Sequence, residues 1–171
     1  ATSTTRPAQT PTAPAGASAV ATGKSGRPRG LSFDAAKVDV KSATNVAQAF
    51  AVTSYTLDAR LDMSPNDGPR RGLGWVSPRL RAALAGPLQG DGGAPWRALV
   101  AADGFTRVSV VEEEAEVVES GNSTSRREHL TVTSLDGRGK QIGQPERFVV
   151  IYDLVRAGSG QSWFVSGIRA S

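Results

Sequence analysis

Residues 146–156, ERFVVIYDLVR, carry apolar side chains on both alternating faces, and this run decides the class of fold. Such a pattern predicts a central β-strand that is covered on both faces. Turn signals lie on either side of it, at Asp136-Gly137 and at Gly158-Ser159-Gly160. The alternating stretches beyond these turns are therefore predicted to pair with it as antiparallel strands; they are 127–134 (REHLTVTS) and 162–169 (SWFVSGIR).

A long helix is predicted upstream of these strands, over residues 42–62 (SATNVAQAFAVTSYTLDARLD). Its core-facing side chains recur every three or four residues and form one face; they are Val46, Phe50, Thr53, Leu57 and Leu61. Ser42 or Thr44 can cap its start, and the SPNDGP run at 64–69 is predicted to end it. A second, short helix is predicted to begin at Ser77-Pro78, and 85–95 (AGPLQGDGGAP) is predicted as a loop.

The stretch 105–119 (FTRVSVVEEEAEVVE) is predicted as a long extended segment. The apolar parity changes after Val110, and this slip predicts a β-bulge near 111–113. An amphipathic helix over 111–119 is the alternative, since glutamate favours helices. Helices followed by strands predict an α+β fold in which the long helix and the short helix pack on one face of a curved, mostly antiparallel four-stranded sheet.

Five glutamates at the end of this stretch form an acidic cluster: Glu112, Glu113, Glu114, Glu116 and Glu119. Calcium needs six or more converging oxygens, and the spacing matches no EF-hand loop. We expect a solvated strand edge, where charge hinders self-pairing. A docking face for a basic partner is the alternative.

Residues 1–30 are predicted to be a disordered basic linker or stalk, and residues 31–171 a single domain. The first 30 residues are mostly Ala, Thr, Pro, Gly and Ser, with four cations and no acid. Such a composition buries too little apolar surface to offset the entropy of ordering. The remainder has 16 basic and 16 acidic residues, so the net charge of +4 belongs to this tail. A basic nucleic-acid-binding face, and with it a specific nucleic-acid partner, is therefore not expected.

The composition excludes several kinds of chemistry. The chain has no cysteine, which excludes disulfides, thiolate metal sites and cysteine nucleophiles. It has one histidine, so no two-histidine metal site can form, and no G-x-S-x-G motif surrounds a serine. We expect neither a metal nor a cofactor. No apolar run is long enough to span a membrane; because the sequence begins with Ala1, we expect a leader or an anchored segment to precede it.

Spaced residues in the predicted helices resemble a known family. Six segments of the chain are similar to segments of small actinobacterial envelope proteins. They are Tyr55-Thr56-Leu57-Asp58-Ala59-Arg60-Leu61-Asp62, Ser64-Pro65, Arg70-Arg71, Trp75-Val76-Ser77-Pro78, Pro95-Trp96 and the closing Trp163-Phe164-Val165-Ser166-Gly167-Ile168. Those proteins are membrane-anchored and resemble the TcpC-like component of conjugative transfer. Their fold is the cone of the nuclear-transport-factor-like (cystatin-like) superfamily, and the resemblance covers about residues 43–170.

The resemblance implies a function without catalysis. Relatives in transfer machines place this domain outside the cytoplasmic membrane, where it makes protein–protein contacts in a type IV-like assembly. It implies envelope or transfer-machine partners, including other copies of the chain, and a membrane contact only through a segment outside this sequence. A secreted or soluble protein is the alternative location. The same cone also hosts SnoaL-like small-molecule binding proteins and enzymes, which are the alternative function.

Four residues are candidates for the pocket of such a cone: Tyr55, Asp58, His129 and Asp153. His129 alternates with Leu130 and is expected to face solvent. Asp58 is expected on the long helix, either exposed or paired with Arg70 or Arg71. Asp153 is expected at the rim of the pocket or inside it. We expect none of the four to be catalytic.

The tryptophans are expected to fill the core, with the indole N–H groups bonded to the backbone. Trp163 is the clearest of them, because alternation places it on the same face as Val165. Stacking of Trp75, Trp96 or Trp163 on a flat ligand is the alternative.

Overall fold

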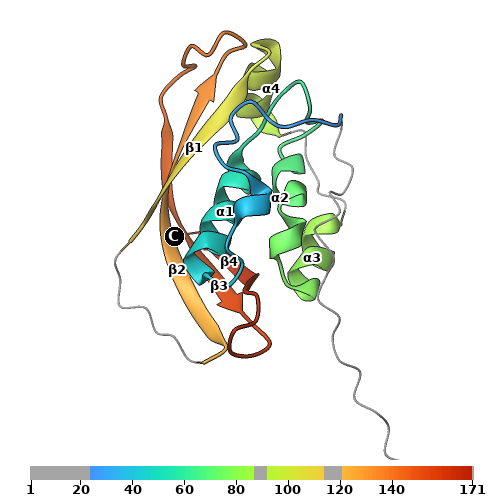
Figure 1. Cartoon of the computed structure of the whole chain (residues 1–171). Helices are drawn as coiled ribbons and strands as arrows, with labels where there is room; N and C mark the ends of the chain where they lie inside the picture. Colours follow the sequence, from blue (N-terminus) through green and yellow to red (C-terminus); the bar gives the residue numbers. More distant parts are fainter. Residues whose placement is uncertain (1–23, 87–91, 114–120, 171) are drawn as a thin grey trace, which may run out of the picture.

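The structure, a computed structural model, describes residues 24–86, 92–113 and 121–170. Within these ranges it has the predicted α+β class, with helices followed by four antiparallel strands in one open sheet. The strands lie in the order β1-β2-β3-β4, and the sheet curves around the helices, which lie on its inner side (Figure 1). The strands are β1 (Phe105–Glu112), β2 (Ser123–Leu135), β3 (Glu146–Val155) and β4 (Phe164–Ala170).

The helices are shorter than predicted, and there are more of them. They are η1 (Ala35–Lys37), α1 (Ala43–Tyr55), α2 (Asp67–Arg71), η2 (Leu73–Trp75), α3 (Pro78–Ala85) and α4 (Gly93–Ala101). The short helix predicted from Ser77-Pro78 is confirmed as α3, where the Ser77 hydroxyl accepts from the Leu80 N–H. The loops predicted at 64–69 and 85–95 are wrong in part, because α2 and α4 begin inside them.

Helix α1 ends at Tyr55, seven residues before the predicted end at Asp62. The Ser42 hydroxyl caps its start by accepting from the Asn45 N–H at 3.2 Å. At the other end, the chain leaves the helix to join the sheet: the Leu57 N–H donates to Thr106 Oγ1 at 2.7 Å, and the Thr106 N–H donates to the Leu57 carbonyl at 2.8 Å. This pairing with β1 competes with the helical pattern and prevails, as tertiary contacts often do over local propensity.

The strand predictions hold, but the predicted bulge does not. β1 pairs with β2 in unbroken register from Phe105 opposite Leu135 to Glu112 opposite Glu128. The alternative helix is also wrong at residues 111 and 112, which are strand; residues 114–119 lie outside the described ranges. The register shift of the sheet lies instead between Asp153 and Leu154, opposite β4.

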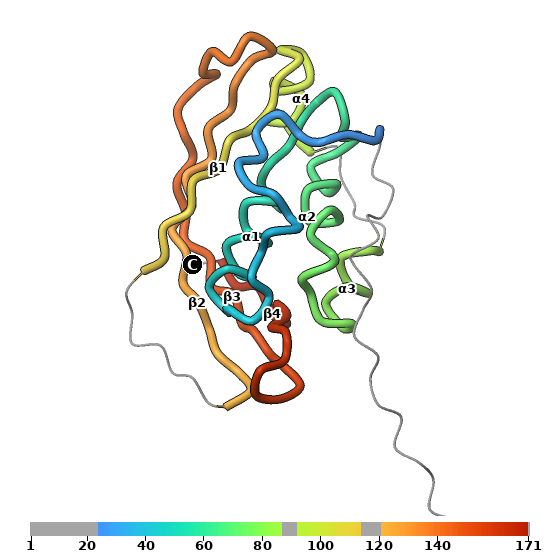
Figure 2. The backbone as a smooth tube through the Cα atoms, viewed as in Figure 1, coloured from blue at the N-terminus to red at the C-terminus, as the bar shows by residue number. Residues whose placement is uncertain are grey.

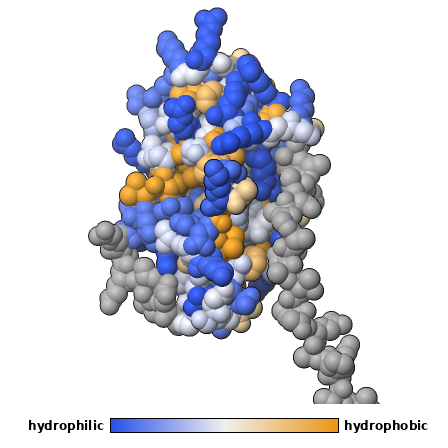
Figure 3. All heavy atoms as spheres, in the orientation of Figure 1, coloured by the Kyte–Doolittle hydropathy of each residue, from blue (hydrophilic) through white to orange (hydrophobic). Residues whose placement is uncertain are grey.

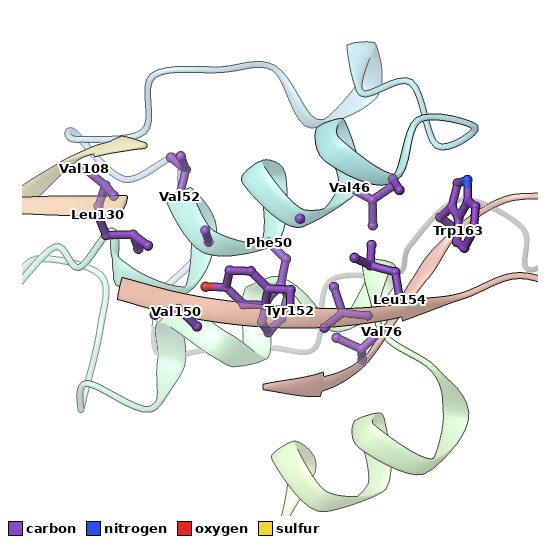
Figure 4. Packing of buried hydrophobic residues seen from close by; sticks show 14 of the residues in the cluster. Val46, Phe50, Val52, Val76, Val108, Leu130, Val150, Tyr152, Leu154 and Trp163 are labelled. Atoms are coloured by element: carbon purple, nitrogen blue, oxygen red, sulfur yellow. The ribbon is translucent and has the colours of Figure 1, made fainter. Parts of the chain in front are cut away.

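The core lies between α1 and the inner face of the sheet (Figure 4). Phe50 of α1 meets Tyr152 of β3 edge to face, with ring centroids 5.9 Å apart. Trp163 and Val165 are buried together, as predicted. Trp96 is also buried and Trp75 is half-buried. Burial of such side chains supplies most of the driving force for folding.

The segment before α1 belongs to this core. It runs back along α1 (Figure 2), and Leu31 and Phe33 pack against the buried cluster. The Lys24 N–H donates to the Leu61 carbonyl at 3.0 Å. The linker predicted over 1–30 therefore contains residues 24–30 that contact the domain, while residues 1–23 lie outside the described ranges.

The outer face of the sheet is uncovered. β3 was expected to be covered on both faces, but no helix among the described residues lies on the outer face (Figure 1). Val149 and Ile151 of β3 point to this side and are half-buried, and Val111 of β1 is 64% exposed. The apolar run that predicted a doubly covered strand thus presents one apolar face to solvent.

Candidate functional site

A cavity of about 340 Å³ lies between the end of α1, helices α2 to α4 and the inner face of the sheet. Most of the side chains around it are apolar. They are Phe50, Tyr55, Leu57, Pro65, Pro69, Leu84, Pro95, Trp96, Leu99, Val132, Phe148, Tyr152 and Ile168, joined by Ser54, Gly92, Thr106, Ser134 and Glu146. This size and composition are typical of a small-molecule site.

Two buried hydroxyls in the cavity wall have no hydrogen-bond partner among the described residues: Ser54 Oγ and the phenol of Tyr152. Tyr152 is fully buried and Ser54 is 7% exposed. A third hydroxyl, Thr106 Oγ1, is already used, because it donates to the Tyr55 carbonyl at 2.6 Å. Unpaired buried hydroxyls cost free energy, and a ligand with a polar group could satisfy them.

The acidity of the tyrosines limits what this wall can do chemically. Burial raises the pKa of Tyr152, and the nearby Tyr55 and Glu128 raise it further. Burial also raises the pKa of Tyr55. Both phenols therefore stay protonated at neutral pH and can donate hydrogen bonds, but they cannot act as bases.

The structure brings only one of the four predicted candidates to this cavity. Tyr55 lines it and packs on Phe148, with ring centroids 5.0 Å apart. His129 and Asp153 lie on the outer face of the sheet, because both alternate with inward-facing neighbours. Asp58 lies in the turn after α1, away from the cavity lining.

His129 and Asp153 are engaged in exposed ion pairs. His129 Nε2 lies 2.9 Å from Glu113 Oε2. Asp153 accepts from Arg169 at 2.6 Å and from the Ser125 hydroxyl at 2.7 Å. The expectation that His129 faces solvent is confirmed. Asp153 lies neither in the pocket nor at its rim.

Asp58 is 1% exposed and is held by Arg29. The Arg29 guanidinium donates to Asp58 Oδ1 at 2.6 Å, and the Arg29 N–H donates to Oδ2 at 2.9 Å. Burial by itself raises the pKa of Asp58, but these hydrogen bonds, the Arg60 N–H and the Arg29 charge bring it below its usual value. Asp58 is therefore neither exposed on the long helix nor paired with Arg70 or Arg71, and both expectations are wrong.

The two arginines after α1 have other partners. Arg71 pairs with buried Asp62 and donates to the Thr56 carbonyl, and Arg70 lies 3.6 Å from Asp67. These contacts tie α2 to the turn after α1. These four charged side chains therefore stabilise the fold, and none of them lines the cavity.

The sequence interpretation missed Glu128, which lies under α1. Its side chain is fully buried on the inner face of β2, and neither carboxylate oxygen accepts a hydrogen bond of normal geometry from the described residues. Burial and the charge of Glu112 raise its pKa to about 7, while the Gln48 amide and Arg126 act in the opposite direction. The parity of Leu130 and Val132 could have placed Glu128 inside, because all three share one face.

Around Glu128 the inner face is polar. Arg126 Nε donates to Thr44 Oγ1 at 2.9 Å and lies 3.2 Å from Glu112 Oε1. The Thr44 hydroxyl donates to the same Glu112 oxygen at 3.1 Å. A buried carboxyl with a pKa near neutrality is a candidate for proton transfer. Glu128 does not line the cavity, however, so no substrate in that cavity would contact it directly.

The described residues contain neither a metal-binding cluster nor a membrane-spanning helix. No group of three or more His, Asp or Glu side chains there could hold a metal ion. No helix of the described ranges combines the length and the apolar character that a membrane crossing needs. The chain matches no protein-family model, no curated protein and no solved structure.

Proposed function

We propose that this chain is a non-enzymatic assembly domain of a cell-envelope machine of the conjugative, type IV-like kind, and that its fold is a nuclear-transport-factor-like cone. Helix α1 packed in a curved sheet, with a cavity at one end, supports the cone. In this proposal the domain lies outside the cytoplasmic membrane. A segment beyond this sequence anchors it.

The observation that carries the proposal is the uncovered outer face of the sheet. Val149 and Ile151 of the central strand β3 lie on it, and Val111 and Val155 are exposed elsewhere on the same face. Exposed apolar side chains gathered on one face are typical of protein–protein contact sites. Of the four predicted pocket candidates, only Tyr55 lines the cavity. Its raised pKa keeps the phenol protonated, so it is a poor base.

The charges on this face suggest the chemistry of the partner. Four arginines and a histidine point outward from the strands: Arg107, Arg127, Arg147, Arg169 and His129. Arg127 and His129 pair with Glu113, and Arg169 pairs with Asp153, so among the described residues Arg107 and Arg147 are the cations that remain for a partner. An apolar surface with an acidic rim is the partner that fits, since such charges favour encounter and orientation.

The proposal is tested with Ile151→Asp in the producing cells. Membrane and soluble material are separated, the true N-terminus is mapped by intact mass, and the solubilised complexes are sized on native gels. We expect the native chain in a large membrane complex that Ile151→Asp removes, while Ala82→Asp on the exposed face of α3 leaves it intact. A native chain that is soluble and runs alone would contradict the proposal.

A second function, binding of a small apolar molecule, is favoured by the unpaired hydroxyls of Ser54 and Tyr152 in the cavity wall. Trp96 lines the same cavity, so its fluorescence reports binding. We expect 2-naphthol to quench it at submillimolar concentration, with an affinity about 10-fold weaker in Tyr152→Phe, the equivalent of one lost hydrogen bond. Unchanged fluorescence at millimolar 2-naphthol excludes this second function.

A further inference from the structure

One edge of the sheet is open along β1. The beginning of this edge strand is covered, since the Thr106 N–H donates to the Leu57 carbonyl at 2.8 Å. Main-chain groups of an antiparallel strand point alternately to its two neighbours. The Glu113 N–H bonds Arg127 of β2, so Val108 and Val110 point their N–H and C=O groups away from β2. No hydrogen bond of the described residues reaches these groups.

A groove runs beside this open edge. It has a volume of about 460 Å³ and lies between β1, α1 and the segment before α1. Half of its lining is apolar, from Phe33, Val38, Ala49, Val52, Val108 and Val110, and half is polar, from Ser32, Lys37, Asp39, Asn45, Gln48 and Ser109. Figure 3 shows apolar side chains gathered in a band from β1 toward that segment. An open strand edge beside a partly apolar groove is a template for an added strand.

We propose that β1 of a second copy of this chain occupies the edge, antiparallel, with Val110 opposite Val110 of the other copy. This inference rests on the proposed assembly function and names one of its partners. It joins two four-stranded sheets into one and merges their outer faces into a single docking surface. The contact is self-complementary, as a two-fold dimer requires.

Charge complementarity selects this register. Residues 108, 110 and 112 carry the free main-chain groups, so even-numbered residues must lie opposite even-numbered residues. With Val110 on the two-fold axis, Arg107 of each copy lies opposite Glu113 of the other, and both residues lie on the outer side. If one β1 strand is shifted by two residues in either direction, Arg107 of one copy no longer lies opposite Glu113 of the other. Opposite charges at directly facing positions stabilise a sheet.

The acidic cluster after Val111 was expected to hinder self-pairing. Glu113 is bound to His129 at 2.9 Å and to Arg127 at 3.5 Å within its own chain. These contacts hold its carboxylate on the outer side, where the second copy brings Arg107. Glu113 therefore sets the register of the pairing and does not prevent it.

The pairing is tested first by cross-linking, which the absence of native cysteine makes free of background. Ser109 lies opposite Val111 of the other copy in a pair without main-chain hydrogen bonds, where the Cα atoms are about 4.5 Å apart. A disulfide spans that distance. Two copies of Ser109 are about 8 Å apart in this register, which is too far for a disulfide.

We expect a mixture of full-length Ser109→Cys and Val111→Cys chains, tagged differently, to give the mixed disulfide as the dominant dimer under mild oxidation. Each variant alone gives little dimer. Equal amounts of mixed and unmixed dimers would overturn the register. A mixture that stays monomeric would overturn the pairing.

The second test is a charge swap, measured as the dimer Kd by sedimentation equilibrium of the 171-residue chain. Arg107→Glu creates two like-charge pairs per dimer and should weaken dimerisation about 10-fold. Adding Glu113→Arg should restore the Kd to within about 3-fold. Arg81→Glu on α3 is the control, because it changes the net charge equally and lies away from β1. Equal effects of Arg81→Glu and Arg107→Glu, or no rescue by the double variant, would overturn the inference.

The two proposals fail in different ways. If the chain gives no β1 cross-link but enters a membrane complex that Ile151→Asp abolishes, the second copy is refuted and the assembly function stands. If the β1 dimer forms and the native chain is soluble without other proteins, the assembly function fails and the dimer stands.

Discussion

Asp58 and Glu128 are both buried carboxylates, 1% and 0% exposed, but their surroundings differ. Asp58 accepts from Arg29 through both the guanidinium and the main chain, and from the Arg60 N–H. Glu128 accepts no hydrogen bond of normal geometry from the described residues, and the nearby Gln48 amide offsets its raised pKa only in part. The pKa of Asp58 is lowered and that of Glu128 is raised to about 7. The buried charge of Asp58 therefore stabilises the fold, while the buried charge of Glu128 destabilises it.

The difference follows from where the donors come from. Arg29 lies in the segment before α1, and it also donates to the carbonyls of Asp103 and Gly104 at the start of β1. Asp58 thus ties three parts of the chain together. Near Glu128, the guanidinium of Arg126 already binds Thr44 and Thr124, and it lies 3.2 Å from Glu112 Oε1.

The largest expected effect comes from breaking the paired carboxylate. Asp58→Ala removes the closest partner of the largely buried Arg29 charge, which keeps Asp103 Oδ1 at 3.9 Å, and should lower the free energy of unfolding by about 3 kcal/mol. Urea unfolding followed by circular dichroism measures this. Asp153→Ala is the matched control, because its partner Arg169 is exposed, and it should leave the urea midpoint unchanged. Equal losses in the two variants would show that burial of Asp58 does not matter.

Neutralising the Glu128 carboxylate should have the opposite sign. A group whose pKa is higher in the folded state than in the unfolded state binds its proton more tightly when folded. Its contribution to stability is complete below the unfolded value and is lost as pH rises toward 7. The native free energy of unfolding should therefore fall between pH 5 and pH 8, and Glu128→Gln should recover roughly 2–3 kcal/mol at pH 8 and little at pH 5.

Urea unfolding at four pH values between 5 and 8 measures this difference. His129→Gln is the control variant, because it changes the neighbouring residue on the opposite face of β2. If Glu128→Gln is destabilising at pH 8, the ionised carboxylate of Glu128 is stabilised by a partner in the folded protein, which contradicts the expected cost of its burial.

Smaller effects on stability are expected from removing the hydrogen-bonded hydroxyl of Thr106 and from removing the unpaired hydroxyl of Tyr152. Thr106→Val removes the bonds to Tyr55 and Leu57 and should lower the free energy of unfolding by about 1–2 kcal/mol. Tyr152→Phe removes a buried hydroxyl that has no partner among the described residues and should raise the free energy of unfolding by about 1 kcal/mol. Thermal unfolding of the two variants measures both effects. A loss in Tyr152→Phe as large as in Thr106→Val would mean that the phenol is bonded in the folded protein.

The class of fold and the strands could be predicted from the sequence because alternation is a local signal. The residues 146–156 mark β3 without any knowledge of its neighbours, and the parity of Leu130 and Val132 places His129 on the outer side. Ser77 and Pro78 likewise mark the start of α3. Each of these features depends on residues a few positions apart.

The candidate site could not be predicted in this way, because its parts are distant in the sequence. Asp58 meets Arg29 and β1 only after the chain has folded, and these contacts are what end α1 early. Glu128 sits on an inward position, but only the packing of α1 reveals that its carboxylate accepts no hydrogen bond of normal geometry from the described residues. Helix α4 was missed because the glycines and the proline before Trp96 indicate a loop, whereas the structure uses Gly92 at φ +77° as the residue before the helix.

The central claim is that the uncovered outer face of the sheet docks a protein in the cell envelope. The most direct measurement places a photo-cross-linking amino acid at Ile151 in the producing cells and compares it with the same residue at Ala82 on α3. The account predicts a discrete membrane-protein adduct from position 151 and none from position 82. Adducts of equal yield from both positions, or none from 151 while the chain is abundant, would contradict it.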